Sequence, residues 1–144
     1  VPLLGICLGM QWLFEESTEA PGCRGLGVLA GSCARLDDRG GTLKVPHVGW
    51  NALAISRPSA LLSGLDEGVY VYFTHSYAAP VTDACVAATT HGDTFAAVVE
   101  RGNVFGVQFH PEKSSDAGLQ IIRNFLAVTR SLSAAAAGGA EAEC

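Results

Sequence analysis

The sequence lacks a long apolar run, an excess of basic residues and any pair of cysteines spaced as C-x-x-C. No apolar stretch is long enough to span a membrane, so we expect no membrane association. A formal net charge of −5 at pH 7 argues against a nucleic-acid partner, because phosphate contacts need clustered Lys and Arg. Five cysteines, odd in number and without paired spacing, argue against a disulfide framework or a structural zinc site. With no secretory or transit pattern, the sequence favours a reducing, cytoplasmic location, and it gives no sign of a metal or cofactor.

The bulk composition favours one globular domain. Hydrophobic residues make up 49% of the chain and charged residues 16%, and 144 residues suffice for a single core. We assign this domain to residues 1–131 and expect the Ala/Gly-rich, acidic stretch 132–144 to be a disordered tail. The chain begins with Val1 rather than Met, inside an apolar stretch that is predicted to be a core strand. We therefore expect a fragment of a longer protein.

The segment Gly-Ile-Cys-Leu-Gly at residues 5–9 is the most informative part of the sequence. It lies between an apolar run and Met-Gln-Trp-Leu-Phe at 10–14, an order that indicates a strand, a sharp turn and a helix continuing to Glu16. A turn of this kind requires small residues on both sides of its central side chain. A helix N-terminus also favours a thiolate, so Cys7 is a candidate nucleophile.

His-Pro-Glu at 110–112 supplies the groups that a thiol nucleophile needs. The preceding stretch 104–109 is apolar enough for a buried strand, and Pro111 stops strand pairing. His110 and Glu112 are two residues apart, so in an extended chain their side chains point to the same side. The carboxylate could then orient the imidazole while the imidazole accepts the proton of Cys7, as in a catalytic triad.

The remaining pattern predicts an α/β fold with an antiparallel portion. An amphipathic helix is predicted over 117–131. Further strands are predicted over 52–55, 69–73, 85–89, 94–100 and 104–109. A nucleophile turn normally lies within a parallel sheet that has strands on both sides, and the sequence supplies only one of those neighbours.

The two motifs resemble the signature segments of the class I (triad) glutamine amidotransferases. Within that superfamily, three further segments look like the glutaminase-subunit family of imidazole glycerol phosphate synthase from histidine biosynthesis. They are Pro-His-Val-Gly-Trp-Asn at 46–51, Tyr-Phe-Thr-His-Ser-Tyr at 72–77 and Pro-Glu-Lys-Ser at 111–114. The resemblance covers roughly residues 1–129. It implies a flavodoxin-like sheet with helices on both faces, from which the N-terminal strands are missing.

The resemblance also implies the hydrolysis of glutamine to glutamate and ammonia. Cys7 would attack the side-chain amide of glutamine, with His110 as base and then acid and with Glu112 orienting the imidazole. The family's substrate-binding positions correspond to Leu8, whose backbone N–H is an oxyanion donor, to Gln11 and Glu19, and to Ser76 and Tyr77 through their backbone.

The ammonia would pass to a (βα)₈-barrel cyclase subunit in a heterodimer. By the resemblance, that subunit makes imidazole glycerol phosphate and an aminoimidazole carboxamide ribotide (AICAR). The sequence contains no P-loop and no second catalytic constellation, so the synthesis must take place elsewhere. Trp50, Tyr72 and Lys113 are the candidate contacts with the cyclase. His47 and His75 are expected to be hydrogen-bonded structural residues.

Three alternatives remain open at this stage. One is a cysteine hydrolase of the α/β-hydrolase or peptidase type, although its acid would normally come well before the histidine. Another is an amidotransferase subunit for anthranilate, GMP or carbamoyl phosphate synthesis, and the third is an inactive remnant. A complete glutaminase subunit carries a glycine-rich loop before the nucleophile strand, which supplies a second oxyanion donor. Because one such donor is worth ~10²–10³ in turnover, we expect the chain alone to have little activity.

Overall fold

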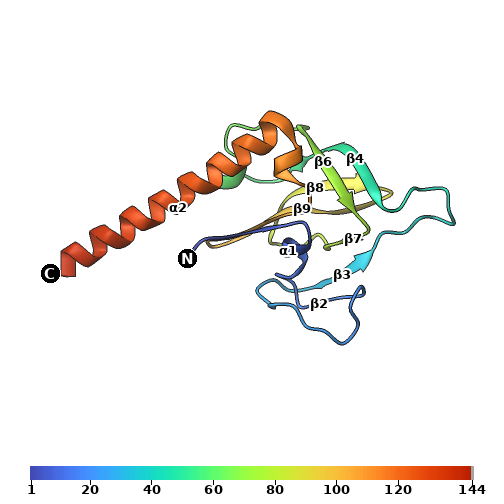
Figure 1. The fold of residues 1–144 in the computed structure, drawn as a ribbon, viewed down its shortest axis with the longest axis horizontal. Helices are drawn as coiled ribbons and strands as arrows, with labels where there is room; N and C mark the ends of the chain where they lie inside the picture. The colour runs from blue at the N-terminus through green and yellow to red at the C-terminus, as the bar shows by residue number, and fades with distance from the viewer. Residues whose placement is uncertain (144) are drawn as a thin grey trace.

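The computed structural model describes residues 1–143 and is built around a five-stranded sheet (Figure 1). In sheet order the strands are β1 (Leu3–Ile6), β10 (Val104–Val107), β9 (Asp93–Arg101), β8 (Cys85–His91) and β5 (Ala54–Ile55). β1 and β10 are parallel, with Leu3 opposite Val104 and Ile6 opposite Val107, whereas the other neighbours are antiparallel. The predicted α/β fold with an antiparallel portion is confirmed.

The parallel pairing of β1 with β10 creates the site. The carboxyl ends of parallel strands lie at the same edge of a sheet, so the residues that follow β1 and β10 meet there. The backbone N–H of Cys7 extends the pairing by donating to the carbonyl of Val107 at 2.8 Å. The two signature motifs therefore become neighbours through main-chain hydrogen bonds.

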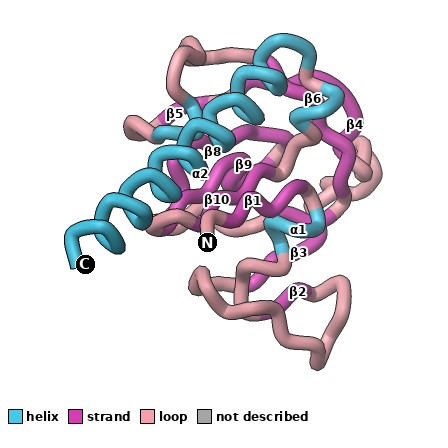
Figure 2. Tube along the Cα trace, turned by 60° about the vertical axis from the view of Figure 1, so that its left-hand side comes forward, coloured by secondary structure: helices cyan, strands magenta, loops and turns pink. Residues whose placement is uncertain are grey.

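The sheet has a separate apolar core on each face. The helices are α1 (Leu8–Gln11) and α2 (Ser115–Glu143). On one face Phe105 of β10 packs with Ile121 of α2, and on the other Val99 of β9 packs with Met10 of α1. Figure 2 shows α2 passing across the strands and α1 beside the end of β1. The expected helices on both faces of the sheet are confirmed.

Shorter elements surround the main sheet. A two-stranded antiparallel sheet consists of β4 (His47–Ala52) and β6 (Tyr70–His75). A three-stranded sheet consists of β2 (Glu16–Ser17), β3 (Ser32–Arg35) and β7 (Tyr77–Ala78). The 3₁₀ turns are η1 (Ala60–Leu62) and η2 (Pro111–Lys113). The middle of β6 lies beside the segment that follows β10, since the backbone N–H of His110 donates to the carbonyl of Tyr72 at 2.9 Å.

The helix after Cys7 is shorter than predicted, because α1 ends at Gln11 rather than near Glu16. The carbonyl groups of residues 12–14 accept hydrogen bonds of 2.7–3.2 Å from backbone N–H groups within 26–29. A returning loop thus takes the acceptors that a longer helix would have used. This tertiary pairing is invisible in the helical periodicity of the sequence.

The C-terminal helix is longer than predicted. We expected helix over 117–131 and a disordered tail over 132–144, but α2 runs from Ser115 to Glu143. Alanine has the highest helix propensity of all residues, and the run of alanines at 134–137 continues the helix. Cys144 lies outside the described residues. Within residues 1–143, no helix is both long and apolar enough to cross a membrane.

Among the described strands, β1 is at the edge of the main sheet and pairs only with β10. The prediction that the strand before the nucleophile has a neighbour on one side only is therefore confirmed. Leu3 and Ile6 of this edge strand are 43% and 37% exposed.

Candidate active site

Cys7 occupies the sharp turn between β1 and α1. Its φ of 54° and ψ of −109° are unfavourable for a residue with a Cβ atom. Strain of this kind is characteristic of functional positions. The carbonyl of Cys7 accepts hydrogen bonds from the backbone N–H groups of Met10 and Gln11, at 3.1 and 3.3 Å, which tie the turn to α1. The predicted strained turn is confirmed.

The two glycines that flank this turn have different roles. A Cβ atom on Gly5 would lie 2.6 Å from the carbonyl oxygen of Gly9, a backbone atom that cannot move aside. A Cβ atom on Gly9 would meet nothing within 4 Å. The prediction that both positions need a small residue is therefore confirmed at Gly5 and wrong at Gly9.

His110 and Glu112 form the hydrogen-bonded pair that the sequence predicts. Nδ1 of His110 lies 2.8 Å from Oε1 of Glu112. The local geometry differs from the predicted extended chain, because Pro111 begins the 3₁₀ turn η2 and Lys113 donates its backbone N–H to the His110 carbonyl at 3.0 Å. With Nδ1–H donating to the carboxylate, Nε2 carries the lone pair of the imidazole. This Nε2 is buried and has no hydrogen-bond partner in the described chain.

Glu112 carries a negative charge in this arrangement. Desolvation would raise the pKa of its carboxyl group, but three other effects outweigh it. Its own backbone N–H, the hydrogen bond from His110, and the charges of His110 and Lys113 together hold the pKa below its usual range. The carboxylate can therefore orient the imidazole and stabilise its protonated form.

The Cys7 thiol is protonated at rest. Desolvation raises its pKa, and the charges of Glu112 and Glu19 add to this, whereas hydrogen bonds from the Leu8 backbone and the Gln108 side chain lower it without reversing the shift. The predicted effect of the helix N-terminus is present, but burial outweighs it. Sγ lies 3.8 Å from the carbonyl oxygen of Thr74, and no hydrogen bond joins it to the imidazole in the described chain. Such a thiol needs a base to become a nucleophile.

Two glutamine side chains connect the thiol to the start of β7. Nε2 of Gln11 donates to the carbonyl of Tyr77 at 2.8 Å and to Oε1 of Gln108 at 3.0 Å. Nε2 of Gln108 then donates to Sγ of Cys7 at 3.6 Å. The amide nitrogen of Gln11, a predicted substrate ligand, is thus used within the site.

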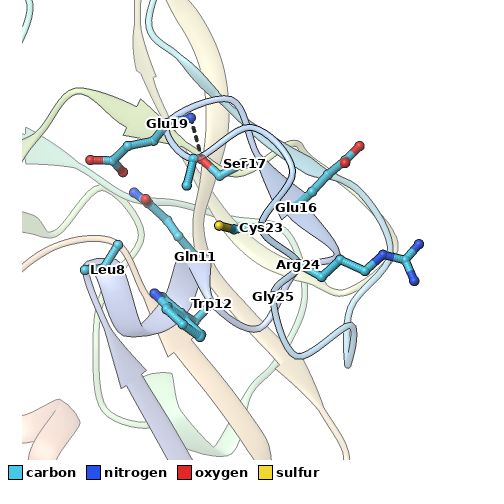
Figure 3. Close-up of a pocket in the computed structure, with 10 residues that line it drawn as sticks. Leu8, Gln11, Trp12, Glu16, Ser17, Glu19, Cys23, Arg24 and Gly25 are labelled. Carbon is cyan, nitrogen blue, oxygen red and sulfur yellow. Dashed lines mark hydrogen bonds between the residues drawn. The ribbon is translucent and has the colours of Figure 1, made fainter.

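Leu8, Gln11 and Glu19 line one small pocket of about 90 Å³. Figure 3 shows the Gln11 amide and the Glu19 carboxylate at one end of it, while the guanidinium of Arg24 points away. The backbone N–H of Glu19 donates to Oγ of Ser17 at 3.2 Å, which holds the loop that carries the carboxylate. The remaining lining residues are Trp12, Glu16, Ser17, Ala20, Cys23, Arg24 and Gly25.

The carbonyl groups of Ser76 and Tyr77 are engaged inside the protein. The Ser76 carbonyl accepts from the backbone N–H of Leu36 at 2.8 Å. The Tyr77 carbonyl accepts from Gln11 and lies 2.9 Å from Nδ1 of His75. Both residues border the site, at the junction of β6 and β7, but their carbonyl oxygens are not free acceptors.

His47 and His75 form a buried pair beside the site. Nδ1 of His47 lies 3.0 Å from Nε2 of His75, and the His47 ring stacks on that of His91 with the centroids 4.1 Å apart. Burial, followed by the neighbouring histidines, lowers the pKa of His47 to about 4. Burial also lowers the pKa of His75 to about 4, against the hydrogen bond to Tyr77. Both rings are neutral at pH 7, and the expectation of hydrogen-bonded structural residues is confirmed.

Trp50, Tyr72 and Lys113 come together on one surface. Trp50 of β4 is opposite Tyr72 of β6, and their rings meet edge to face with centroids 5.9 Å apart. Nζ of Lys113 lies 6.0 Å from the centroid of Tyr72. Trp50 is 50% exposed and Val48, on the same strand, 45% exposed. We call this surface, Val48, Trp50, Tyr72 and Lys113, the aromatic patch.

Sequence reasoning assigned no role to Gln108 or Thr74, although both contact the thiol. The available signal was a polar residue at 108 inside the apolar run 104–109. The amide of Gln108 is fully buried, which a polar side chain reaches only with hydrogen-bond partners. Within residues 1–143, no cluster of three His, Cys, Asp or Glu residues could hold a metal ion.

Comparison with known proteins points to a single family. The glutamine amidotransferase class-I family matches residues 1–128. An imidazole glycerol phosphate synthase subunit HisH from Xanthomonas euvesicatoria is 54% identical over 126 residues, covering 88% of this chain and 62% of that protein. The subunit of the same name from Xylella fastidiosa is 52% identical over 127 residues, with the same coverage of 88% and 62%.

Comparison of the fold with solved structures identifies the same family. A crystal structure of a glutamine amidotransferase superimposes with a TM-score of 0.58 at 26% identity, over 87% of this chain and 59% of that one. The chain spans about 62% of the length of the curated relatives described above. On the family match over residues 1–128, the chain belongs to the class I glutamine amidotransferases.

Proposed function

We propose that this chain carries the glutaminase centre of an imidazole glycerol phosphate synthase. It hydrolyses glutamine to glutamate and ammonia, and the ammonia passes to a cyclase subunit in histidine biosynthesis. The observation that carries the proposal is the pair of His110 and Glu112 at 2.8 Å, with a buried, unpartnered Nε2 at the sheet edge where Cys7 lies. The names of the relatives support the choice of synthase.

Catalysis begins with proton transfer. Nε2 of His110 takes the thiol proton of Cys7 as Sγ attacks the amide carbon of glutamine, and a tetrahedral intermediate forms. The imidazolium, stabilised by Glu112, returns the proton to the departing nitrogen, and ammonia leaves. Water then attacks the thioester with His110 again as base, which releases glutamate and restores the thiol.

The resting geometry suits this sequence of events. A half-buried, protonated thiol reacts slowly with other electrophiles, and it becomes nucleophilic only when the base receives its proton. The Leu8 backbone N–H already lies close enough to Sγ to lower the pKa of Cys7, so it is the available oxyanion donor. No hydrogen bond joins Cys7 to Nε2 of His110 in the described chain, and catalytic hydrogen bonds often form fully only when substrate binds.

The pocket accounts for recognition of an amino-acid substrate. The Glu19 carboxylate at the pocket end suits the α-ammonium group of glutamine, and the pocket leads back along Gln11 towards Leu8. Ser76 and Tyr77 contribute by fixing the site wall, with their backbone N–H groups as the candidate substrate contacts. Gln11 contributes to substrate recognition through its amide, which hydrogen bonds to Tyr77 and Gln108 hold in place.

The aromatic patch is the proposed contact with the cyclase. Trp and Tyr are enriched among the residues that dominate the binding energy of protein interfaces. The patch adjoins the His110–Glu112 pair, because Lys113 belongs to the same 3₁₀ turn, η2, as Glu112. A partner on this surface can therefore influence the triad directly, and the partner that we propose, from the resemblance, is a (βα)₈-barrel cyclase.

A glutaminase assay with and without the cyclase tests the proposal. We expect little glutamate release by the chain alone and a clear rise when the cyclase and its ribonucleotide substrate are added. The Cys7→Ala variant should lose this activity, whereas Cys144→Ser, a matched thiol replacement, should keep it. Stimulation by an anthranilate or GMP synthase subunit instead would assign the chain to another pathway. Activity that survives in Cys7→Ala would refute the mechanism.

A further inference from the structure

Gln108 is a fully buried polar residue at the end of an otherwise apolar strand. Its backbone N–H donates to the carbonyl of Ala97 at 2.8 Å, so its main chain is fixed to β9. A buried amide without partners is costly, and each polar atom of this side chain has one. The partners of Gln108 are Gln11 and the nucleophile Cys7.

The direction of these hydrogen bonds is fixed by the backbone. The carbonyl of Tyr77 can only accept, so the atom of Gln11 that faces it is the amide nitrogen. The same nitrogen then requires an acceptor on Gln108, which assigns Oε1 to that contact. The NH₂ group of Gln108 is consequently left facing Sγ of Cys7, as a donor, at 3.6 Å.

We propose that Gln108 is a positioning residue for the nucleophile, which holds the sulfur of Cys7 in place and stabilises its thiolate during proton transfer to His110. The proposal rests on the proposed role of Cys7. An N–H donor favours the charged form of its acceptor, so the bond strengthens as the thiol proton leaves.

Several groups around Cys7 disfavour its thiolate, so stabilisation by Gln108 matters. Two carboxylates, Glu112 and Glu19, face the thiol and disfavour a second negative charge. The carbonyl of Thr74 binds the S–H form, at 3.8 Å, and so also favours the protonated state. The groups that favour the thiolate are the Leu8 backbone N–H and the amide of Gln108.

Gln11 has a second function in this account. Its amide nitrogen donates both to the Tyr77 carbonyl and to Oε1 of Gln108. These two hydrogen bonds prevent the amide of Gln108 from rotating. A rotated amide would present Oε1 to the sulfur and repel the thiolate. The Tyr77 carbonyl, at the start of β7, therefore determines through Gln11 that the NH₂ group of Gln108 faces Cys7.

The pH dependence of alkylation at Cys7 tests the proposal without requiring turnover. Iodoacetamide is small and neutral, and its rate of reaction follows the thiolate fraction. The rate is measured for the Cys7 peptide by mass spectrometry from pH 6 to 11, on the whole chain. Gln108→Met removes donor and acceptor at similar volume, and Gln108→Glu keeps the acceptor for Gln11 but removes the NH₂ donor. Gln120→Met, on α2, is the matched control.

Both Gln108 variants should shift the midpoint of Cys7 alkylation upward by about one pH unit, which is ~tenfold in rate at a fixed pH below the midpoint. The shift should be larger for Gln108→Glu, because a carboxylate replaces the donor. Gln120→Met should leave the profile unchanged. Unchanged midpoints in folded Gln108 variants would overturn the proposal, because a merely structural amide would not affect the titration of the thiol.

A second measurement covers the case in which both variants fail to fold. In the unaltered chain, the side-chain NH₂ signals of Gln108 in NMR spectra should move with the same midpoint as Cys7 alkylation. Cys7→Ala should abolish that movement. Signals of Gln108 that are insensitive to pH would refute the contact. If Cys7 is not alkylated at any pH, the proposed role of Cys7 as nucleophile is refuted. This result is distinguishable from a failure of the Gln108 proposal, in which Cys7 is alkylated with an unchanged midpoint.

Discussion

Substitution of Gly5 by alanine should disrupt the turn that carries Cys7. The added Cβ would lie 2.6 Å from the Gly9 carbonyl oxygen and 2.8 Å from the backbone nitrogen of Met10. Backbone atoms cannot rotate away, so β1 and α1 would have to separate. Overpacking typically costs about 1–3 kcal/mol, and we expect Gly5→Ala to reach about 3 kcal/mol because no side chain can yield.

Gly9→Ala is the matched control within the same motif. Its Cβ would meet nothing within 4 Å, and Gly9 lies inside α1. Replacing glycine by alanine in a helix is favourable by about 0.5–1 kcal/mol, so this variant should be neutral or slightly more stable. The two substitutions add the same methyl group to the same turn and should have opposite effects.

Urea unfolding followed by circular dichroism measures both variants. With a slope of about 1.5 kcal/mol/M, a loss of about 3 kcal/mol lowers the midpoint by about 2 M. Near-equal midpoints for Gly5→Ala and the unaltered chain would refute the close approach at this turn. A loss in Gly9→Ala as large as that in Gly5→Ala would show that the space around Gly9 is not open.

Three further variants test the pair of buried histidines, the triad and the aromatic patch. The pKa values of about 4 for His47 and His75 lie below that of an unfolded histidine. The unfolded chain therefore takes up protons first, and the free energy of unfolding should fall as the pH drops from about 6.5 towards 4. His75→Gln should flatten this dependence in urea titrations, and an unchanged slope would contradict the pKa shift. Glu112→Gln should slow glutamine hydrolysis in the cyclase complex by about 10²-fold or more, because the imidazolium loses its counter-charge, and near-normal turnover would remove Glu112 from the triad. Trp50→Ala should weaken binding to the cyclase by about tenfold or more in calorimetry without changing the urea midpoint, whereas unaltered affinity would place the interface elsewhere.

Much of the site could be predicted from local sequence. The turn at Cys7 follows from glycines between an apolar run and a helix-forming segment. The stretch 104–109 predicted β10, which spans Val104–Val107. Since β1 and β10 are parallel neighbours, the two motifs had to meet at one edge.

The features that could not be predicted depend on contacts between distant segments. Helix α1 stops early because a loop at 26–29 supplies hydrogen bonds to residues 12–14. The donor role of Gln108 depends on Gln11, which is 97 residues away in sequence. Gly9 lies in open space, which no local pattern reveals. Helix α2 extends to Glu143 because helix propensity prevails in the alanine run where composition suggested disorder.

The central claim is that Cys7 is the nucleophile activated by His110 and Glu112. The most direct test is to incubate the chain with a glutamine-analogue electrophile and to identify the labelled peptide by mass spectrometry. The account predicts label on Cys7, protection by excess glutamine, and much slower labelling in His110→Asn. Cys23, which lines the pocket formed by Leu8, Gln11 and Glu19, is the internal comparison. Label on Cys23 with Cys7 unmodified would contradict the account.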